Sequence, residues 1–350
     1  MKIAVVGAGF TGCSIALKLS DEYQVTLFEK EKDILLGASA YNQMRFHYGY
    51  HYPRSQKTID EIKVSKNDFL NFYGKSIFDK TKTFYSIPFK KIKTNPKDFE
   101  KFLKKKNFYF KEIKKKNFLS NNLDKTYEVN EKILNYFTFK KKIKKMLKKT
   151  NVKIKVNSEI KKSDLTLYDK VIVATYSSNN TILKNLGIKI IDKFRYELIE
   201  KIVIKLPTKY KNRSFVVIDG DFVCCDPYLG TPYHLLSDVL NSKIKIIKKK
   251  FPNFNLPHKK FINKIPRKRL HLTRYNDFIK KSSYYLPFLK KAKYIKSMYT
   301  IRTLKLNKEK TDERTNYLKK INNKIFVVLT GKWNTSMSIA IKINKLFKQK

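Results

Sequence analysis

Residues that form cross-links or bind metals are scarce in this sequence. It contains three cysteines among 350 residues, and Cys13, Cys224 and Cys225 are too few and too unevenly spaced to predict a disulfide framework or a zinc site. We therefore expect no metal centre. No apolar run approaches the roughly 20 residues that cross a bilayer, and no signal peptide is recognisable. A cytoplasmic protein without a transmembrane segment is expected.

Arginine and the acidic residues are scarce as well. The 78 basic residues exceed the 29 acidic ones by a formal charge of +49, which by itself suggests a nucleic-acid partner. However, only nine of the basic residues are arginine and 69 are lysine, and lysine has A/T-rich codons, as do the abundant isoleucine, asparagine, phenylalanine and tyrosine. Coding bias therefore explains the charge, and nucleic acid is not the expected partner. An arginine that survives this bias marks a place where its planar group with five donors is needed.

Apolar residues are abundant enough for a folded chain. They make up 42% of the sequence, and aromatic residues make up 14%. These values exclude a wholly disordered polycation, because such chains lack core-forming residues. The length predicts one large or two medium-sized domains.

The N-terminus carries the pattern of a dinucleotide-binding unit. Lys2 to Val6 predict a buried strand, and the following residues 7–12, GAGFTG, fit the pattern G-x-G-x-x-G. A helical pattern and a second strand, Gln24 to Phe28, come next, and Glu29 closes the unit. This strand–helix–strand context makes a short glycine motif specific.

Each glycine of this motif has a physical role. Gly7 permits the tight turn, Gly9 allows the backbone to approach a pyrophosphate, and Gly12 allows close packing of helix on strand. The helix N-terminus directs its free N–H groups at the phosphates. Glu29 lies 17 residues after Gly12, near the spacing expected of an acid that accepts hydrogen bonds from ribose hydroxyls.

The nucleotide-binding sheet is expected to be discontinuous in sequence. Tyr168 to Thr175 predict a buried strand in the middle of the chain. Near the C-terminus Ile325 to Leu329 predict another, followed by Thr330-Gly331-Lys332 and a helical tail. A nicotinamide dehydrogenase usually completes its cofactor domain in one block, whereas a domain closed by a C-terminal strand, glycine and helix is typical of flavoproteins.

Six segments together resemble a known family, the FAD-dependent oxidoreductases of the D-amino-acid-oxidase and glycine-oxidase type, which include enzymes similar to L-2-hydroxyglutarate oxidase. They are GAGFTG at 7–12, VTLFEK at 25–30, GASAYNQ at 37–43, HYGYHYPRS at 47–55, VIVAT at 171–175 and TGKWNTS at 330–336. The first two occur in many flavoproteins, and the stretch from Gly37 to Ser55 is more specific. Two departures are visible: no Gly-Asp pair precedes Gly331, and Thr175 continues into Tyr176-Ser177 instead of glycine.

The resemblance implies FAD as cofactor and an α/β fold of two domains. A Rossmann-like FAD-binding domain would comprise residues 1–75, 150–192 and 295–350, and a substrate domain with a mixed antiparallel sheet would comprise 76–149 and 193–294. The expected cofactor contacts are Gly7, Gly9, Phe10, Thr11, Gly12, Glu29, Lys30, Ser39, Asn42, Thr175, Gly331, Lys332 and Trp333.

A dense polar segment, residues 45–54, is the candidate active site. It contains two of the five histidines and two of the nine arginines. A substrate carboxylate needs a bidentate cation, so Arg45 and Arg54 are candidate substrate-binding residues. His47, His51 and Tyr50 are candidate catalytic groups, since a hydroxyl substrate needs a base. The alternatives are histidines satisfied by backbone carbonyls, and arginines paired with surface acids or the FAD pyrophosphate.

A second candidate lies on a predicted strand from Met298 to Leu304. Arg302 sits there beside apolar residues, where a charge must meet an anion or lose its hydration at high cost. In the resembled family this strand commonly contributes a substrate-facing arginine or aromatic group, so Arg302 is predicted to contact substrate. Arg314 is expected to form a local ion pair with Asp312 or Glu313.

The sequence thus predicts an FAD-dependent oxidoreductase of the amino-acid or hydroxy-acid oxidase or dehydrogenase type. A small, carboxylate-bearing substrate would lose hydride from a C–N or C–OH bond to flavin N5, and oxygen or another acceptor would reoxidise the flavin. Two alternatives remain open: a non-redox enzyme similar to the flavin-dependent sugar-nucleotide mutases, and a polyanion-binding protein on a degenerate flavoprotein fold.

Overall fold

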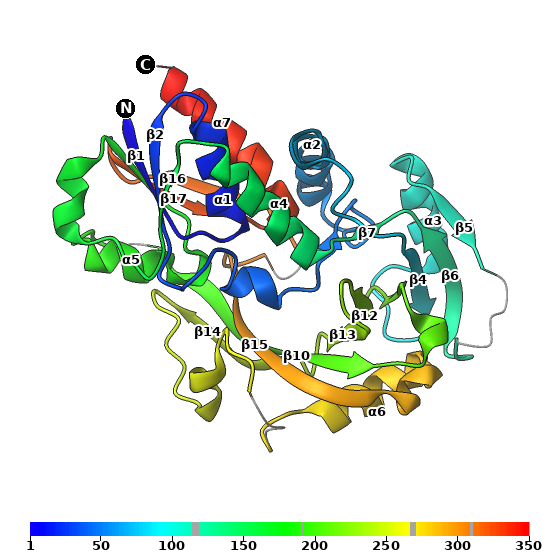
Figure 1. The fold of residues 1–350 in the computed structure, drawn as a ribbon. Coiled ribbons are helices and arrows are strands. Elements are labelled where there is room, and N and C mark those ends of the chain that lie inside the picture. Colours follow the sequence, from blue (N-terminus) through cyan, green and yellow to red (C-terminus); the bar gives the residue numbers. More distant parts are fainter. Residues whose placement is uncertain (114–118, 191, 267–270, 309–310, 350) are drawn as a thin grey trace.

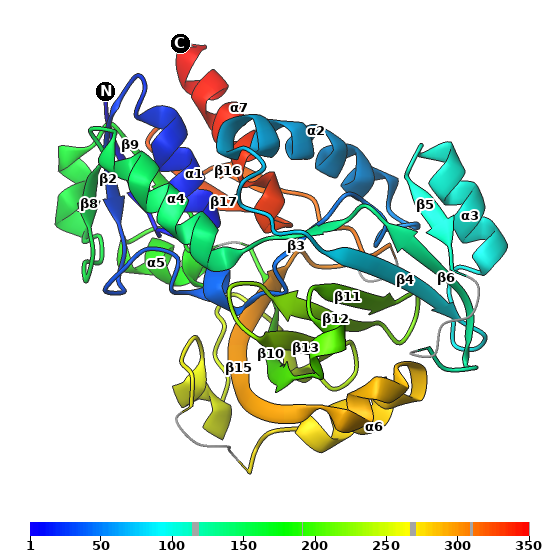
Figure 2. The same ribbon diagram turned by 45° about the vertical axis from the view of Figure 1, so that its right-hand side comes forward.

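Two β-sheets organise the chain (Figures 1 and 2). The computed structural model describes residues 1–113, 119–190, 192–266, 271–308 and 311–349. One sheet is built from both ends and the middle of the chain, and the other from the segments between them. Among the described residues, none of the helices combines the length and the apolar character that a membrane crossing needs.

The first sheet has six strands in the order β16-β17-β9-β1-β2-β8. All neighbours pair in parallel except β16 and β17, which are antiparallel. Its central strands are short apolar runs, as expected of strands that are covered on both faces. The bounds are β1 (Lys2–Val6), β2 (Gln24–Phe28), β8 (Lys153–Lys155), β9 (Lys170–Val173), β16 (Tyr317–Lys320) and β17 (Ile325–Leu329). The discontinuous parallel sheet predicted from the sequence is confirmed.

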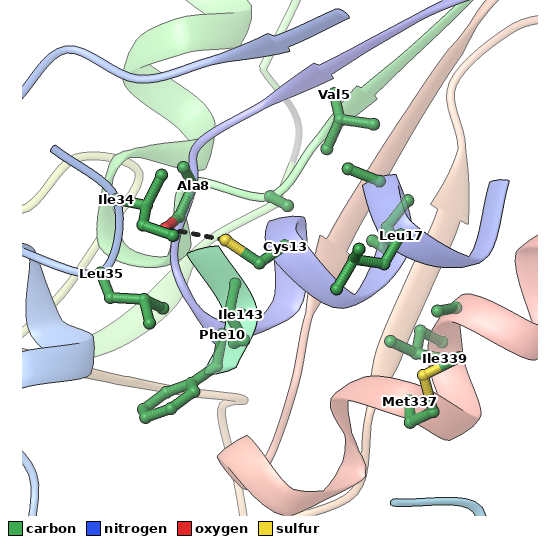
Figure 3. Close-up of a cluster of buried hydrophobic side chains, with 14 of the residues drawn as sticks. Val5, Ala8, Phe10, Cys13, Leu17, Ile34, Leu35, Ile143, Met337 and Ile339 are labelled. Carbon is green, nitrogen blue, oxygen red and sulfur yellow. Dashed lines mark hydrogen bonds between the residues drawn. The ribbon is translucent and has the colours of Figure 1, made fainter. Parts of the chain in front are cut away.

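Helices cover both faces of this sheet. One face packs against α1, α4 and α7, and Figure 3 shows this core, in which the Cys13 thiol donates to the Ala8 carbonyl at 3.4 Å. The other face packs against α5. α2 lies against α7 on the side of the second sheet. The bounds are α1 (Phe10–Leu19), α2 (Gln56–Tyr73), α4 (Tyr136–Lys148), α5 (Asn179–Asn185) and α7 (Ser336–Lys348).

The second sheet has nine strands in the order β14-β10-β13-β12-β11-β4-β6-β5, with β15 also paired to β10. It is mixed, because β4 and β11 run parallel while the other pairs are antiparallel. The bounds are β4 (Lys82–Pro88), β5 (Phe110–Glu112), β6 (Leu123–Val129), β10 (Phe194–Lys205), β11 (Arg213–Val217), β12 (Val223–Tyr228), β13 (Tyr233–Asp238), β14 (Lys243–Lys249) and β15 (Lys293–Leu304). Two helices flank it, α3 (Pro96–Lys105) and α6 (Tyr275–Tyr285).

Several short elements lie between the longer strands and helices. β3 (Arg45–Phe46) pairs with β7 (Lys132–Ile133). The 3-10 turns are η1 (Ala38–Tyr41), η2 (Lys162–Leu167), η3 (Tyr176–Ser178), η4 (Thr208–Tyr210), η5 (Pro257–Phe261), η6 (Pro287–Lys291) and η7 (Trp333–Thr335).

Two segments lie apart from the domain expected for them. β15 belongs to the second sheet, although residues 295–350 are expected in the cofactor domain. α4 packs into the core of the first sheet, although residues 76–149 are expected in the substrate domain. In both cases the long-range partner decides the placement: β10 for β15, and α1 for α4.

Candidate active site

One cavity of about 530 Å³ joins the two sheets. Its lining begins at the Gly7–Gly12 loop and Glu29, follows residues 37–45, and ends on the facing side chains of β10 and β15. The parallel strands β1, β2 and β9 all end beside it, and such carboxyl ends are where open α/β sheets bind ligands.

The glycine loop is folded as tightly as its motif predicts. Gly7 has a φ of +98°, and a Cβ there would lie 2.9 Å from the Ala174 carbonyl oxygen. A Cβ on Gly12 would lie 1.7 Å from the Gly7 carbonyl oxygen. A side chain at either position would therefore push the N-terminus of α1 away from the sheet.

Glu29 is held in a position that suits a ribose. One carboxylate oxygen accepts from the Ala8 N–H at 2.8 Å and the other from the Glu31 N–H at 3.0 Å. Burial raises the pKa of this carboxyl group. Because a carboxylate offers about four acceptor sites, Glu29 keeps capacity for the hydroxyls of a ligand in the cavity that it lines.

The other predicted cofactor residues surround the same cavity. The Ser39 hydroxyl accepts from the Phe10 N–H at the start of α1, and Asn42 donates to the Ser39 carbonyl. The predicted contacts that line the cavity are Gly7, Gly9, Phe10, Thr11, Glu29, Lys30, Ser39, Asn42, Thr175, Gly331, Lys332 and Trp333. Gly12 instead packs below the loop. The tight glycine turn, the helix N-terminus and Glu29 fit a dinucleotide such as FAD.

Only some residues of the predicted active-site segment, 45–54, line the cavity. Arg45, His47 and His51 line the cavity. Tyr50 and Arg54 do not belong to its lining as far as the structure describes it. The Tyr50 hydroxyl donates to the Tyr109 carbonyl at 2.8 Å. The catalytic roles of these residues stay predictions.

Both arginines of this segment bind carboxylates of the protein. Arg45 is buried, and its two terminal nitrogens pair with Glu131 at 3.0 Å and with Asp226. Arg54 bridges Asp219 at 2.8 Å and Asp312 at 2.5 Å. These partners come from distant segments of the sequence, so their contacts favour a structural role over the predicted substrate contact.

The two histidines are neutral near pH 7. Burial, followed by the charge of Lys332, lowers the pKa of His47 to about 4. Burial lowers the pKa of His51 well below its ordinary value, and the ring stacks on Phe222 at 4.8 Å. Neither side chain therefore carries the positive charge of the cavity.

Three cations face the cavity from different elements. Arg302 on β15 donates from Nε to Glu197 at 2.6 Å, and Glu197 raises its pKa against the opposing effect of burial. Burial lowers the pKa of Lys332 to about 7, and its amine lies 3.3 Å from His47 Nε2. Lys201 on β10 donates to Gln43 at 3.0 Å, and burial lowers its pKa to about 8.

Two polar residues of this region were missed by the sequence analysis. Lys201 is one of 69 lysines. Its only distinguishing feature in the sequence is that it lies two residues from Ile199 and so on the same face of the strand. Glu131 is almost fully buried and contacts Arg45, Tyr48, Tyr85 and His47. No local motif surrounds it.

Arg314 forms the predicted local ion pair with Asp312, at 3.4 Å.

Comparisons with known proteins agree with this architecture. Residues 2–85 match the family model DAO, described as FAD dependent oxidoreductase. The FAD-dependent monooxygenase kojA of Aspergillus flavus is 33% identical over 87 residues, which are 25% of this chain and 20% of that protein. The chain therefore spans about a fifth of the length of this curated relative.

Solved structures share the fold over nearly the whole chain. L-proline dehydrogenase from P. horikoshii superposes with a TM-score of 0.73 at 13% identity, covering 99% of this chain and 93% of that one. L-alpha-glycerophosphate oxidase from Mycoplasma pneumoniae, with FAD bound, superposes with a TM-score of 0.72 at 15% identity, covering 100% and 95%. Residues 2–85 thus match the model of the FAD-dependent oxidoreductase family DAO, and the whole chain shares the fold of these solved structures.

Proposed function

We propose that the protein binds FAD and oxidises a C–N or C–OH bond of a small anionic substrate. One observation carries the proposal: the cavity that begins at the glycine loop and Glu29 ends among Arg302, Lys332 and Lys201. A dinucleotide fits the first end, and the second end offers positive charge to a carboxylate. When bound, FAD supplies the acceptor for the hydride that the substrate loses.

Arg302 is the residue that we propose binds the substrate carboxylate. Its guanidinium is anchored by Glu197, which leaves the remaining donors in a fixed plane, and 37% of its side chain is exposed. A planar group with several donors matches a carboxylate better than an amine does. Arg195 also pairs with Glu197, at 2.7 Å, so Glu197 does not depend on Arg302 alone for a cationic partner.

The cavity lining around these cations orients the rest of the substrate. Ile199 and Thr300 face each other across β10 and β15 and lie between Lys201 and Arg302 on the cavity face. Phe222 and His51 add an aromatic pair. Because these walls are largely apolar and neutral, they exclude water from the reacting carbon and strengthen the attraction between an anion and the cations.

The cofactor part of the proposal has a direct optical test. We expect the purified protein to show a flavin absorption spectrum, and Gly9→Glu to abolish it, because the added carboxylate would occupy the space in which the pyrophosphate approaches the backbone and would repel it. Ser163→Glu adds the same charge at an exposed position and is expected to keep the spectrum. A colourless wild-type protein that takes up no added FAD would contradict the proposal.

The substrate part is tested by anaerobic bleaching of the bound flavin. The panel comprises amino acids, N-methyl amino acids, 2-hydroxy acids and sugar derivatives. We expect bleaching by carboxylate-bearing members and none by the matching amides. Turnover of a nucleotide sugar without bleaching by any of these compounds would replace the proposal with the mutase alternative.

A further inference from the structure

A buried charge cluster lies directly behind the cavity. Its centre is Glu131, between β6 and β7, which is 2% exposed. One of its carboxylate oxygens accepts from Arg45 at 3.0 Å and from the Tyr85 hydroxyl. The other accepts from the Tyr48 N–H at 2.9 Å. Two segments that are distant from Glu131 along the chain, residues 45–48 and strand β4, therefore converge on this carboxylate.

A line of side chains leads from this carboxylate into the cavity. The oxygen that binds Tyr48 also lies 3.6 Å from His47 Nδ1. On the far side of the same ring, His47 Nε2 lies 3.3 Å from the Lys332 amine. The His47 carbonyl accepts from the Asn334 side chain at 3.1 Å, which fixes the backbone of the histidine. The Lys332 amine lines the cavity, 5.0 Å from the centre of the Tyr52 ring.

We propose that Lys332 takes up the proton that the substrate releases, and that Glu131 is a positioning residue that orients His47 as the partner of the Lys332 amine. This inference rests on the proposed function for the identity of the reaction. The neutral His47 ring places its Nδ1–H toward Glu131 and its Nε2 lone pair toward Lys332. A carboxylate behind an imidazole fixes the tautomer in this way in other buried sites.

The proton balance is simple. As the substrate carbon loses hydride to the cofactor, the N–H or O–H bond of the substrate breaks and its electron pair forms the new C=N or C=O bond. The released proton passes to the lone pair of the neutral Lys332 amine. The resulting ammonium donates to His47 Nε2, and its charge faces the carboxylate of Glu131 across the ring. The proton leaves to solvent after the product does.

The charges around Lys332 explain why this carboxylate matters. Besides burial, Arg314, Arg302 and Lys201 lower the pKa of Lys332, whereas Glu131 raises it. His47 and Tyr52 are the titratable groups in contact with the amine. Burial acts to raise the pKa of Glu131, but His47, Arg45 and Tyr85 outweigh it and hold this pKa below its ordinary value. Glu131 therefore stays ionised and balances a region that is otherwise positive.

The test measures the protonation of Lys332 directly. Competitive labelling of the purified full-length protein with acetic anhydride across pH, read by mass spectrometry, gives the pKa of the Lys332 amine without any substrate. Wild-type protein is expected to titrate near 7. Glu131→Gln keeps the shape and removes the charge, so we expect the pKa of Lys332 to fall. Glu200→Gln, at a buried carboxylate that binds Thr273 and Tyr299 outside the cavity lining, should leave it unchanged.

A second variant keeps the test decisive if Glu131→Gln does not fold. His47→Leu leaves the pairs of Arg45 with Glu131 and Asp226 in place and removes the acceptor of the ammonium, so the pKa of Lys332 should again fall. In turnover, both variants should lower kcat about tenfold or more with little change in KM. An unchanged labelling pKa in a folded variant overturns the proposal. A protein that binds no flavin refutes the proposed function instead, and the labelling result still stands.

Discussion

Each cation in the cavity is held by a different kind of partner. Arg302 is paired with the carboxylate of Glu197, Lys201 with the neutral amide of Gln43, and Lys332 with the neutral ring of His47. A buried cation without a facing anion keeps part of its desolvation cost in the folded protein. A bound anion should therefore stabilise the folded protein most where it contacts these two lysines.

Replacing Arg302 should affect substrate binding more than folding. Arg302→Leu removes the guanidinium but leaves Glu197 paired with Arg195, so we expect a folded, flavin-loaded enzyme. Since a hydrogen bond to a charged group contributes about 1.5–3 kcal/mol, KM for a carboxylate substrate should rise about 10- to 100-fold. Steady-state kinetics measure this, and Arg302→Lys should recover only part of the loss. An unchanged KM would exclude Arg302 as the carboxylate-binding residue.

Replacing Lys332 should stabilise the protein before any ligand is added. Lys332→Met keeps the length of the side chain and removes a buried charge. Below about pH 7 the ammonium is present in both folded and unfolded chains, and only the folded state bears the burial cost. Above pH 7 the folded amine is neutral, so stability rises with pH until the unfolded amine also titrates.

The sign of this effect can be read from thermal unfolding of the flavin-free protein. We expect Lys332→Met to raise Tm at pH 6 and to raise it less at pH 9. A gain of 1 kcal/mol corresponds to roughly 2–4 °C for a chain somewhat shorter than this one. An equal gain at both pH values would mean that Lys332 does not titrate between them.

The residues of the site differ in how far the sequence could reveal them. Glu29 could be predicted, because its distance from the glycine motif is set by the strand–helix–strand unit that binds a dinucleotide. Arg45 and Arg54 were predicted to bind substrate from their neighbours in sequence, but their partners Glu131 and Asp219 lie far away along the chain. Lys201 and Glu131 have no motif at all. The partners of these side chains are set by contacts between segments that are distant in sequence, and a local sequence pattern does not reveal such contacts.

At the scale of elements, the C-terminal turn before α7 depends on one close approach. A Cβ on Gly331 would lie 1.7 Å from the Arg314 carbonyl oxygen. The Asn316 side chain accepts from the Gly331 N–H at 3.1 Å and from the Thr335 hydroxyl at 2.6 Å. Residues 314–316 are thus locked onto the turn that carries Lys332.

Gly331→Ala should disturb this contact and the cofactor site together. Because the clash is with backbone, we expect a loss of stability of about 1–3 kcal/mol and weaker retention of FAD, measured by thermal unfolding and by flavin release on dilution. Gly37→Ala is the matched control for the stability measurement, since a Cβ there meets no protein atom within 4 Å. Equal stability of the two variants would show that the close approach at Gly331 does not contribute to the fold.

The elements themselves were predicted unevenly. β1, β2 and β17 were predicted with the bounds that the structure shows, because continuous apolar runs mark strands buried on both faces. β15 is twelve residues long, whereas only residues 298–304 of it were predicted. The pairing of Glu197 with Arg302 explains the difference: charged residues interrupt each apolar pattern and are satisfied only across the strand pair.

At the scale of the whole molecule, the net charge of +49 produces a field that every anion meets before it reaches the cavity. Such a field raises association rates and is screened by salt, with a Debye length of about 10 Å at 0.1 M. A coding bias that enriches lysine thus has a physical effect even where no single lysine was selected for it.

This field makes a kinetic prediction. For an anionic substrate, kcat/KM should fall as ionic strength rises from about 10 mM to about 200 mM, while kcat changes little, because screening affects encounter rather than the bound state. An uncharged analogue of the same substrate is the control and should show a flat profile. A salt-independent kcat/KM for the anion would mean that the surface charge does not guide substrate.

The single tryptophan of the chain lies beside the glycine loop, in the lining of the cavity. Trp333 follows Lys332 in the cavity lining, and its ring stacks on Phe10 of the glycine loop at 5.2 Å. The tryptophan fluorescence of the protein therefore comes from one indole placed beside the dinucleotide end of the cavity. Its quenching by energy transfer reports occupancy of that end, so the molecule carries a built-in optical probe of its own cofactor.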